Sequence, residues 1–378
     1  MPRLDTRNAD ASLRIRRLAY AAPIVLGLAV LAGCSSSSST TAPESTTPSV
    51  SGLTAYITNS EDNGSGKGMG SVIPVSLADQ APGTPIQMGE GTGPNDIVIT
   101  ADGKTAYVTN EYTGTVAGID LATGVVSAPI TVGAEPVALA FVPKTNEQWI
   151  WVANYQGQTI TTVNVATGKV GQTIKVPNAG PNTVAFTPDG RTCFVANWGT
   201  DNVAGSTVTP IEVTDGGAGG RILPSIKVGL NPNWIAVTQD GSTAYVANKG
   251  SSSVTPIDVK TSKAGAALAV PGPPIELEIA PDGRLAYVAI AGSAPEMDEV
   301  VPLDLTTAPA TVGQAIKLAP KSQPHWIAFT PDGKTAYVVG NGDSTLTPIT
   351  VDGGVAQTPI VLTTDPAADL LAIALSPV

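Results

Sequence analysis

The chain has 378 residues, of which 40 are Gly and 32 are Pro, while 13% are charged and 4% are aromatic. This density of turn formers and helix breakers argues against a helix-rich architecture and predicts short strands joined by many turns. The net charge of −11, without a run of Lys and Arg beyond the first residues, argues against a nucleic-acid partner, and two cysteines exclude a disulfide scaffold.

The first 33 residues carry the features of an export signal. A basic segment ending in Arg16 and Arg17 precedes an apolar run over 18–31, about fourteen residues against the roughly 20 that a membrane-spanning helix needs. The run ends in Leu-Ala-Gly-Cys, which resembles the lipobox of bacterial lipoproteins, where the cysteine, here Cys34, becomes the acylated first residue. An ordinary secretory signal with an incidental Cys34 is the alternative, and the Arg pair leaves the twin-arginine route open.

Residues 34–51 are dominated by Ser, Thr and Pro and cannot bury enough apolar surface to fold. We therefore predict a signal peptide over 1–33, a tether over 34–51 and one folded domain over 52–378. The lipobox resemblance implies a membrane partner through a lipid anchor on Cys34. It also implies a location outside the cytoplasm, on the outer face of the bacterial cell membrane or on the outer membrane.

One short pattern recurs seven times along residues 52–378. Its clearest copies read Ala-Tyr-Val, then Thr or Ala, then Asn, as at 106–110 and 244–248. Blades of β-propellers repeat at about 40 to 50 residues and are built of strands and turns, whereas helical solenoids show a 3.6-residue period. The recurring aromatic residues are Tyr56, Tyr107, Trp151, Phe194, Tyr245, Tyr287 and Tyr337.

Each repeat resolves into four strand-like segments. These are an apolar segment closed by an Asp-Gly turn, the aromatic segment, a third segment such as 254–258 and a short fourth one. The first copy lacks its own first segment, while residues 370–375 form a first segment with no successor. We therefore predict an all-β fold, a seven-bladed β-propeller of four-stranded antiparallel blades, closed by the C-terminal strand completing the N-terminal blade.

Several residues are predicted to be structural. The Asn that closes the aromatic segment in five copies has the character of a turn residue, and the Asp-Gly pairs belong to hairpins. Cys193 stands in a strand pattern and is expected to be buried and inert. Proline recurs in the third segment of five copies, where its missing N–H predicts a local gap in strand pairing. These prolines are Pro74, Pro210, Pro256, Pro302 and Pro348.

With Tyr-Val-Thr-Asn and Pro-Asp-Gly at fixed offsets, the repeats resemble the YVTN-family β-propellers. The resemblance covers residues 52–378 and implies a seven-bladed propeller of a group tied to bacterial surface-layer proteins and related to lactonases. The sixth and seventh copies depart from the pattern, since Ile290 and Gly340 replace the Asn.

The residues that begin the first segment of each copy should stand around the mouth of the central channel, where the innermost strands converge. The repeat is least uniform at these positions and supplies hydrogen-bonding, aromatic and titratable side chains, a composition typical of a ligand site. Glu278 is included because it occupies a position that holds Ala or Val in the other copies. The candidate ligand-binding residues are Asn95, Asp96, Asn182, Asn233, Trp234, Glu276, Glu278, His325 and Trp326.

Turn or rim packing is the competing interpretation of these residues, because Asn after a loop Pro commonly caps a turn. Catalysis would rest on His325 as a base, and no nucleophile elbow, phosphate loop or HExxH motif occurs. His325 with the acidic candidates only faintly resembles an oxygen-rich cation cage. We therefore assign no catalytic residue, no cofactor and no metal site from the sequence.

The sequence thus predicts an exported, lipid-anchored module of the cell envelope. It would bind an envelope protein, a glycan or a small molecule at the channel mouth, or serve as a scaffold, and a non-enzymatic role is favoured. One alternative is a lactonase-like hydrolase that uses the channel mouth, which the family resemblance permits. A structural surface-coat protein is the other alternative, because propellers serve binding, scaffolding and catalysis alike.

Overall fold

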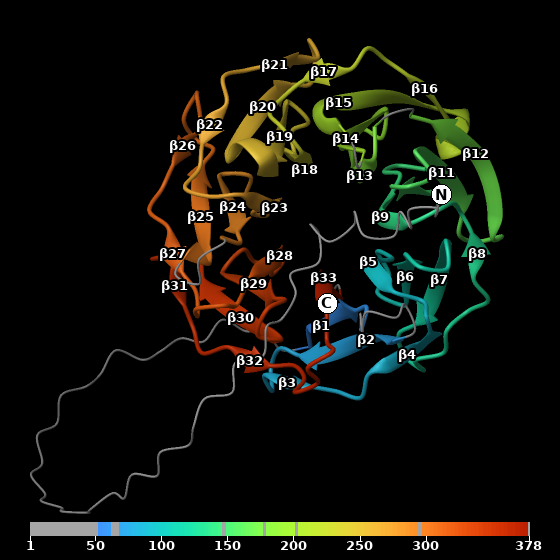
Figure 1. The fold of residues 1–378 in the computed structure, drawn as a ribbon, viewed down its shortest axis with the longest axis vertical. Coiled ribbons are helices and arrows are strands. Elements are labelled where there is room, and N and C mark those ends of the chain that lie inside the picture. The colour runs from blue at the N-terminus through green and yellow to red at the C-terminus, as the bar shows by residue number, and fades with distance from the viewer. Residues whose placement is uncertain are drawn as a thin grey trace, which may run out of the picture. The chain divides into compact units, whose positions relative to one another are not determined.

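The computed structural model describes residues 52–61, 68–145, 149–176, 179–200, 203–292 and 297–376. The predicted signal peptide, the predicted tether and Cys34 lie outside these residues. From residue 52 onward, seven antiparallel sheets follow one another around a central axis (Figure 1). The predicted seven-bladed β-propeller is confirmed.

The first four blades contain the following strands and one 3-10 turn. Blade 1 has β33 (Leu370–Leu375), β1 (Thr54–Asn59), β2 (Met69–Ser76), β3 (Ala81–Pro82) and β4 (Ile86–Glu90). Blade 2 has β5 (Pro94–Ile99), β6 (Thr105–Asn110), β7 (Thr115–Asp120) and β8 (Ile130–Thr131). Blade 3 has β9 (Pro136–Phe141), β10 (Trp149–Asn154), β11 (Thr159–Asn164) and β12 (Lys169–Lys175). Blade 4 has β13 (Pro181–Phe186), β14 (Thr192–Thr200), β15 (Val203–Thr214), η1 (Asp215–Gly217), β16 (Gly219–Ile222) and β17 (Ile226–Lys227).

The last three blades repeat the same order. Blade 5 has β18 (Pro232–Val237), β19 (Thr243–Asn248), the 3-10 turn η2 (Lys249–Ser251), β20 (Ser253–Asp258), β21 (Lys263–Ala264) and β22 (Leu268–Ala269). Blade 6 has β23 (Pro274–Ile279), β24 (Leu285–Ile290), β25 (Glu299–Asp304), β26 (Thr311–Val312) and β27 (Ile316–Lys317). Blade 7 has β28 (Pro324–Phe329), β29 (Thr335–Gly340), β30 (Thr345–Thr350), β31 (Val355–Ala356) and β32 (Ile360–Val361). The described residues contain no helix with the length and apolar character that a bilayer span requires.

The two ends of the propeller sequence meet in blade 1, as predicted. Strand β33 pairs antiparallel with β1, with Tyr56 opposite Ala374 and Ile57 opposite Ile373. The backbone N–H of Ser376 also donates to the carbonyl of Thr54, at 2.9 Å. This pairing gives blade 1 the inner strand that its own segment lacks and closes the ring.

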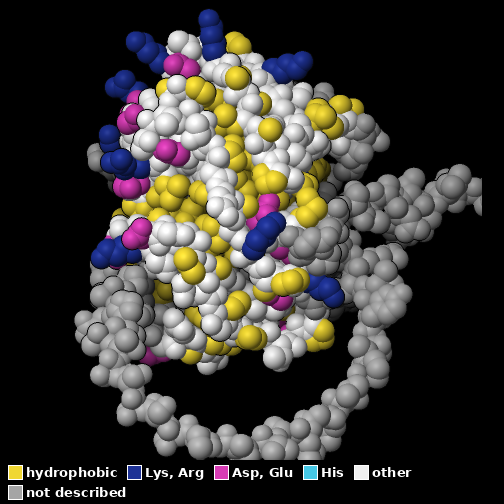
Figure 2. Space-filling view, turned by 90° about the vertical axis from the view of Figure 1, so that its left-hand side faces the viewer, with side chains coloured by type: hydrophobic (Ala, Val, Ile, Leu, Met, Phe, Trp, Pro, Cys, Tyr) yellow, Lys and Arg dark blue, Asp and Glu magenta, His cyan; other side chains and the backbone are white. Residues whose placement is uncertain are grey.

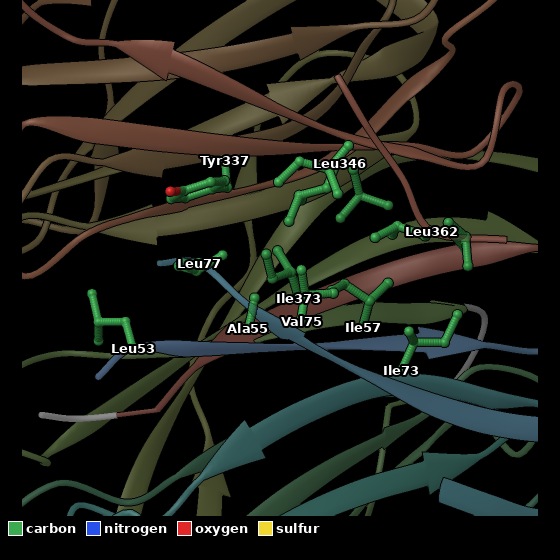
Figure 3. Close-up of a cluster of buried hydrophobic side chains, with 13 residues drawn as sticks. Leu53, Ala55, Ile57, Ile73, Val75, Leu77, Tyr337, Leu346, Leu362 and Ile373 are labelled. Carbon is green, nitrogen blue, oxygen red and sulfur yellow. The ribbon is translucent and has the colours of Figure 1, made fainter. Parts of the chain in front are cut away.

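Apolar packing between neighbouring blades holds the ring together. Between blades 7 and 1, Ile57 and Val75 of blade 1 share one buried cluster with Tyr337 and Leu346 of blade 7, and Ile373 of β33 lies beside them (Figure 3). Both faces of each aromatic strand meet a neighbouring blade in this way, and all six residues of β10 are buried. Since most strand faces are covered, the fold needs few charged residues.

The predicted gap in strand pairing is confirmed at the third-strand prolines. In blade 5, β22 pairs with Ser253 and Val254, while β21 pairs with Ile257 and Asp258, so no outer strand faces Pro256. The outer strand is divided in the same way in all five blades that carry this proline. Blade 3 has Thr162 at that position, and its outer strand β12 runs unbroken. Blade 2 has Gly118 at that position, and its outer strand is divided too, since β8 pairs with Thr115 and Val116 and Val126 pairs with Ile119. The missing N–H of proline therefore accounts for the gap in the five blades that carry it, but a gap also forms without proline.

The Asn residues that close the aromatic segments act as clamps as well as strand-end residues. In blade 4 the amide nitrogen of Asn197 donates to the hydroxyls of Thr207 and Thr209 at 2.9 and 2.8 Å. In blade 3 the amide of Asn154 makes the equivalent bonds to β11. Cys193 is fully buried, as expected, and burial raises the pKa of its thiol.

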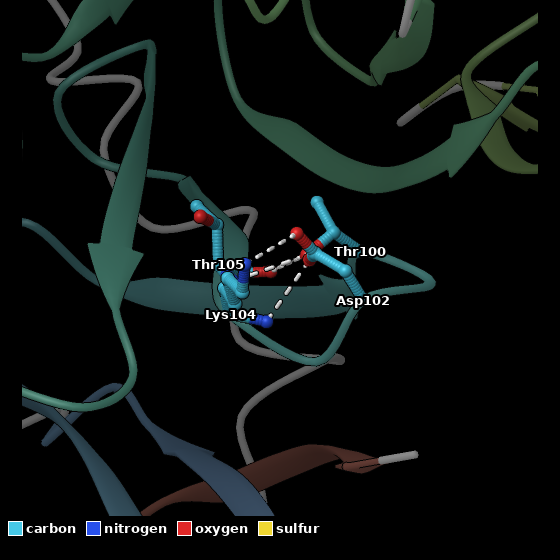
Figure 4. Close-up of polar contacts among 4 residues, drawn as sticks. All are labelled: Thr100, Asp102, Lys104 and Thr105. Carbon is cyan, nitrogen blue, oxygen red and sulfur yellow. Dashed lines mark hydrogen bonds and ion pairs between the residues drawn. The ribbon is translucent and has the colours of Figure 1, made fainter.

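The Asp-Gly hairpins have the structural role predicted for them. In blade 2 the Asp102 carboxylate accepts hydrogen bonds from the Thr100 hydroxyl at 2.6 Å and from the Lys104 backbone N–H at 3.1 Å (Figure 4). These bonds hold the pKa of Asp102 below its usual range. Seen edge-on, charged side chains of both signs gather at the left and upper margin, a smaller group lies to the right of the centre, and the surface between them is mainly hydrophobic and uncharged (Figure 2).

Candidate functional site

Seven inner strands line the central channel and position the predicted residues. In each of them a register shift follows the first residue, so the second residue has no direct partner on the aromatic strand. A bulge of this kind redirects a side chain out of the regular ladder. The second residues include Asn95, Asn182, Asn233 and His325, and all four are half-buried. We call the region around them the channel mouth.

Three of these side chains tie one blade to the next. The amide of Asn182 donates to the backbone carbonyl of Asn233 at 2.9 Å. The amide of Asn233 in turn donates to the carbonyl of Ile275, and Nδ1 of His325 lies 3.1 Å from the carbonyl of Leu371. The rim-packing interpretation therefore describes part of what these residues do. Asn95 differs, because its amide donates to the Glu111 carboxylate of its own blade at 2.8 Å.

The hydrogen bond of His325 defines its tautomer. A carbonyl oxygen can only accept, so Nδ1 carries the proton and Nε2 keeps its lone pair. Burial lowers the pKa of His325, an effect that the Leu371 carbonyl and the Asp369 carboxylate partly offset, while the charge of Lys249 lowers the pKa further. His325 is therefore a neutral imidazole at pH 7, with one nitrogen able to accept a proton.

Lys249 is a site residue that the sequence reasoning missed. Among the described residues it is the one Lys or Arg that is not solvent-exposed. Its Nζ atom lies 5.4 Å from the ring centroid of Trp198, within reach of a cation–π contact, and burial lowers its pKa. Its backbone N–H donates to the carbonyl of Asn231 at 3.0 Å, two residues before Asn233, which places Lys249 beside the channel mouth. Its charge lowers the pKa of His325.

A signal for Lys249 was present in the repeat. It is the first residue after the recurring Asn, and that position varies in the copies as strongly as the predicted positions do. Its occupants are Ser60, Glu111, Tyr155, Trp198, Lys249, Ala291 and Asn341. Comparing this position across the copies would have found a second polar and aromatic ring, adjacent to the first.

Asp96 does not stand free at the mouth as predicted. Its side chain is 3% exposed and is turned toward blade 3. Its two oxygens accept the backbone N–H of Ile97 at 2.7 Å and that of Leu139 at 2.9 Å. Burial raises the pKa of Asp96 to about 7, although both amides act to lower it. Asp96 therefore ties blades 2 and 3 together.

Glu276 and Glu278 lie on β23, deeper in the ring than the second residues. Glu276 is 1% exposed, and neither of its carboxylate oxygens has a hydrogen-bond partner among the described residues. Burial raises the pKa of Glu276 well above its usual range, and the neighbouring Glu278 raises it further. Glu278 is half-buried, and burial raises its pKa to about 8.

The two predicted tryptophans come together although their blades are not neighbours. Trp234 of blade 5 and Trp326 of blade 7 meet edge to face, with ring centroids 4.3 Å apart and an interplanar angle of 74°. Both rings are partly buried, and both also contact the apolar clusters between blades. The pair therefore lies across the channel on the inner side of blade 6, which restricts passage through the centre of the ring.

Other concave regions lie away from the predicted residues. One groove of about 420 Å³ is lined by residues of blades 6 and 7, including Tyr287, Pro302 and Ile316. A second, of about 410 Å³, is lined by residues of blades 1 and 2, including Tyr56 and Pro74. Within the described part of the chain, no group of three or more His, Cys, Asp or Glu side chains is arranged to hold a metal ion.

Comparisons with known proteins agree with the architecture. The model of the lactonase seven-bladed β-propeller family matches residues 211–368, which is less than half of the chain. No curated protein matches the sequence. The family match begins in β15 of blade 4 and includes Lys249, Glu276 and His325.

Solved structures share the fold at low sequence identity. The periplasmic gluconolactonase of Pseudomonas aeruginosa is 17% identical with a TM-score of 0.67, over 86% of this chain and 99% of that one. A candidate 6-phosphogluconolactonase of Bacteroides fragilis is 18% identical with a TM-score of 0.68, over 87% and 99%. Virginiamycin B lyase of Staphylococcus aureus is 13% identical with a TM-score of 0.59, over 76% and 96%. These likenesses establish the propeller fold. Because the three similar proteins carry names of different activities, the function of this chain has to be argued from its own site residues.

Proposed function

We propose that the channel mouth binds a small lactone and hydrolyses it. The observation that carries the proposal is the neutral His325, whose Nδ1–H is directed to the Leu371 carbonyl so that Nε2 is the proton acceptor. In this reaction Nε2 takes a proton from water as the water oxygen adds to the lactone carbonyl. The ring C–O bond then breaks, the imidazolium returns the proton to the leaving oxygen, and a hydroxy acid forms.

The surroundings of His325 supply the other groups that the reaction needs. Lys249 provides a partly desolvated positive charge, which stabilises negative charge developing on the carbonyl oxygen. The amides of Asn95 and Asn182 offer acceptor oxygens for substrate hydroxyls, and Trp198 offers a flat apolar face. A hydroxylated lactone of a sugar acid matches this combination.

The comparisons support a hydrolase over a purely structural module. The family match and the fold likeness to the Pseudomonas gluconolactonase both favour lactone chemistry. The proposal departs from the non-enzymatic role that the sequence favoured. The reason is Lys249, which gives His325 the electrophilic partner that the sequence reasoning did not find.

The proposal is tested by hydrolysis of glucono-1,5-lactone, followed by titration of the released acid against the spontaneous rate. We expect His325→Gln to lower kcat/KM by about 10²–10⁴-fold, because general base catalysis contributes about that much. Lys249→Met should lower kcat/KM by about 10²-fold or more, as loss of an electrostatic stabiliser does. The hairpin variant Asp332→Asn, on an exposed turn, serves as the matched control and should keep full activity.

The pH profile gives a second, independent readout. Since the pKa of His325 is lowered, the base stays neutral below the usual pKa of about 6.5, and the rate should fall only at lower pH. A wild-type rate equal to the spontaneous rate for this lactone and its 6-phosphate would overturn the proposal, as would an unaltered rate in His325→Gln.

The competing proposal for the channel mouth is a binding or scaffolding module that does not turn its ligand over. A structural coat protein, the third alternative, would need no ligand site at the channel mouth. A lactone or sugar that raises the melting temperature without being turned over would favour the binding module. The His325→Gln and Lys249→Met variants should then weaken the ligand-induced shift while leaving the melting temperature of the free protein within a few degrees.

We further propose that the protein is exported and anchored to the bacterial envelope through a lipid on Cys34. The proposal rests on the signal and lipobox pattern of the sequence alone. Cys34→Ala should release the protein from the membrane fraction in cell fractionation. Wild-type protein recovered wholly in the soluble fraction would contradict the anchor.

A further inference from the structure

Glu276 and Glu278 form a carboxylate pair inside the ring. They lie two residues apart on β23, so their side chains leave the same side of the strand. Their partners on β24, Ala289 and Tyr287, pack against blade 7, so this side faces blade 7. The position of Glu278 is filled by small apolar residues in every other blade. Those residues are Val98, Ala140, Ala185, Ala236, Ala328 and Ala374. The second carboxylate is therefore specific to blade 6 and is not required by the fold.

Backbone groups do not satisfy this pair, in contrast to Asp96. Asp96 occupies the place of Glu276 in blade 2 and accepts two backbone N–H groups, at 2.7 and 2.9 Å. The Glu276 side chain is one methylene longer, and both of its oxygens are buried without a hydrogen-bond partner among the described residues. The N–H of Ile327, which corresponds to that of Leu139, acts to lower the pKa of Glu276, but burial raises it by more, and no hydrogen bond to either oxygen forms.

No protein cation neutralises the pair either. In the described ranges, the ion pairs involve neither glutamate, and every Lys and Arg apart from Lys249 is exposed. The adjacent strand β24 places Ala289 opposite Glu276 and Tyr287 opposite Glu278. A buried carboxylate without a hydrogen bond or a counter-charge is costly, and bound cations commonly remove this cost.

We propose that Glu276 and Glu278 bind a divalent metal cation of the Ca²⁺ type. Carboxylate oxygens are the preferred ligands of hard cations. Two carboxylates leave the rest of the coordination sphere to water and backbone carbonyls. We therefore expect weak affinity, with a dissociation constant of about 10⁻⁴–10⁻³ M, as in extracellular calcium modules. The site is independent of the hydrolysis proposed for His325.

The test uses chelator-treated wild-type protein and follows its melting temperature as CaCl₂ is added, with NaCl at matched ionic strength as the reference. We expect the melting temperature to begin to rise at about 10⁻⁴–10⁻³ M Ca²⁺ and then to increase with the logarithm of the Ca²⁺ concentration, because a ligand that binds only the folded state stabilises it by RT ln(1 + [Ca²⁺]/Kd). Equilibrium dialysis should give one bound Ca²⁺ per chain. Lactone hydrolysis is not needed for either readout.

The variant Glu278→Ala should weaken Ca²⁺ binding by at least about tenfold. It introduces the residue that Ala236 and Ala328 already supply at this position, so the ring is expected to fold. Glu276→Gln should weaken binding similarly. Glu212→Ala, at a side chain that is 47% exposed and lies on another blade, should bind Ca²⁺ as the wild type does. The same melting rise in CaCl₂ and in matched NaCl would overturn the proposal. Undiminished binding by Glu278→Ala and Glu276→Gln would overturn it as well, since the bound ion would then lie elsewhere.

Discussion

Blades 5 and 6 fasten the same hairpin in two different ways. In blade 5, the amide of Asn248 at the end of β19 donates to the Thr255 hydroxyl of β20 at 2.8 Å and to further oxygens of that strand. In blade 6, Ile290 stands at this place and makes no such bond. Glu299 replaces the Ser or Thr of the other blades, is buried, and forms an ion pair with Lys317 of β27. Blade 5 therefore joins the two strands by the neutral, buried amide of Asn248. Blade 6 has the apolar Ile290 instead, and its Glu299 is paired with Lys317 of the outer strand β27.

The difference shows which positions the ring leaves free to change. Blade 6 keeps the apolar residues that pack against blades 5 and 7, such as Leu277, Val288 and Val300, all fully buried. Its acidic departures, Glu278 and Glu299, lie on the inner strand and at a strand end, outside the apolar clusters that join the blades. Polar and acidic residues can therefore accumulate there without loss of the fold.

Removing the blade 5 clamp should have the largest effect. Asn248→Ala leaves the hydroxyl of Thr255, which is buried, and the N–H of Gly229, which is half-buried, without their amide partner. We expect the free energy of unfolding in urea to fall by about 3 kcal/mol, because buried polar groups left unpaired cost about 1–3 kcal/mol each.

A matched control distinguishes the effect of losing the buried Asn248 amide from the effect of losing an exposed side-chain amide. Gln357 also donates two hydrogen bonds from its side chain, at 3.2 Å each, but it is exposed. Gln357→Ala should alter stability by no more than about 0.5 kcal/mol. Equal effects of the two substitutions would mean that Asn248 is not a clamp.

Sequence reasoning predicted the fold because the structural signals are local and repeated. The aromatic segment gave the number of blades, and the unpaired first segment at residues 370–375 gave the closure. The gap at Pro256 followed from the missing N–H of proline. Each of these conclusions needs only the chemistry of a short segment and its position in the repeat.

The site was predicted less completely because a bulge decides where the side chains point. Asn95 and Asp96 are adjacent in sequence, yet the register shift leaves Asn95 at the mouth and turns Asp96 into the interface with blade 3. A sequence pattern cannot separate two such neighbours. Lys249 escaped prediction because it follows the repeated Asn, in a segment that the sequence pattern predicts to be a turn.

Asp96 and Glu276 occupy the same position in blades 2 and 6, but only Asp96 accepts hydrogen bonds from backbone N–H groups. The pKa of Asp96 is raised to about 7 in the folded state, against about 3.9 in the unfolded chain. The folded state therefore binds this proton more tightly, and the stabilisation that protonation gives is lost as the pH rises through this range. We expect Asp96→Ala to remove about 2 kcal/mol of the stability difference between about pH 5 and about pH 8.

The measurement is urea unfolding of wild type and Asp96→Ala across this pH range, in the presence of a chelator. Alanine fits the position, since Ala138 and Ala372 occupy it in blades 3 and 1. The hydrogen bonds lost by the variant lower its stability throughout, so the difference between the two pH slopes is the diagnostic quantity. Parallel slopes would show that Asp96 is already ionised at pH 5.

The smallest effect is expected from the ion pair that replaces the clamp in blade 6. Glu299 is buried, with 5% of its side chain exposed, whereas 64% of the Lys317 side chain is exposed, so solvent screens the attraction. We expect Lys317→Ala to lower the free energy of unfolding by about 1 kcal/mol, and by less at high salt. The double variant Glu299→Thr/Lys317→Ala restores the Thr found here in blades 2, 3, 4 and 7, and should recover this loss. If the double variant is no more stable than Lys317→Ala, an unpaired Glu299 does not destabilise the fold. The difference between blades 5 and 6 would then lie in side-chain packing and not in the ion pair.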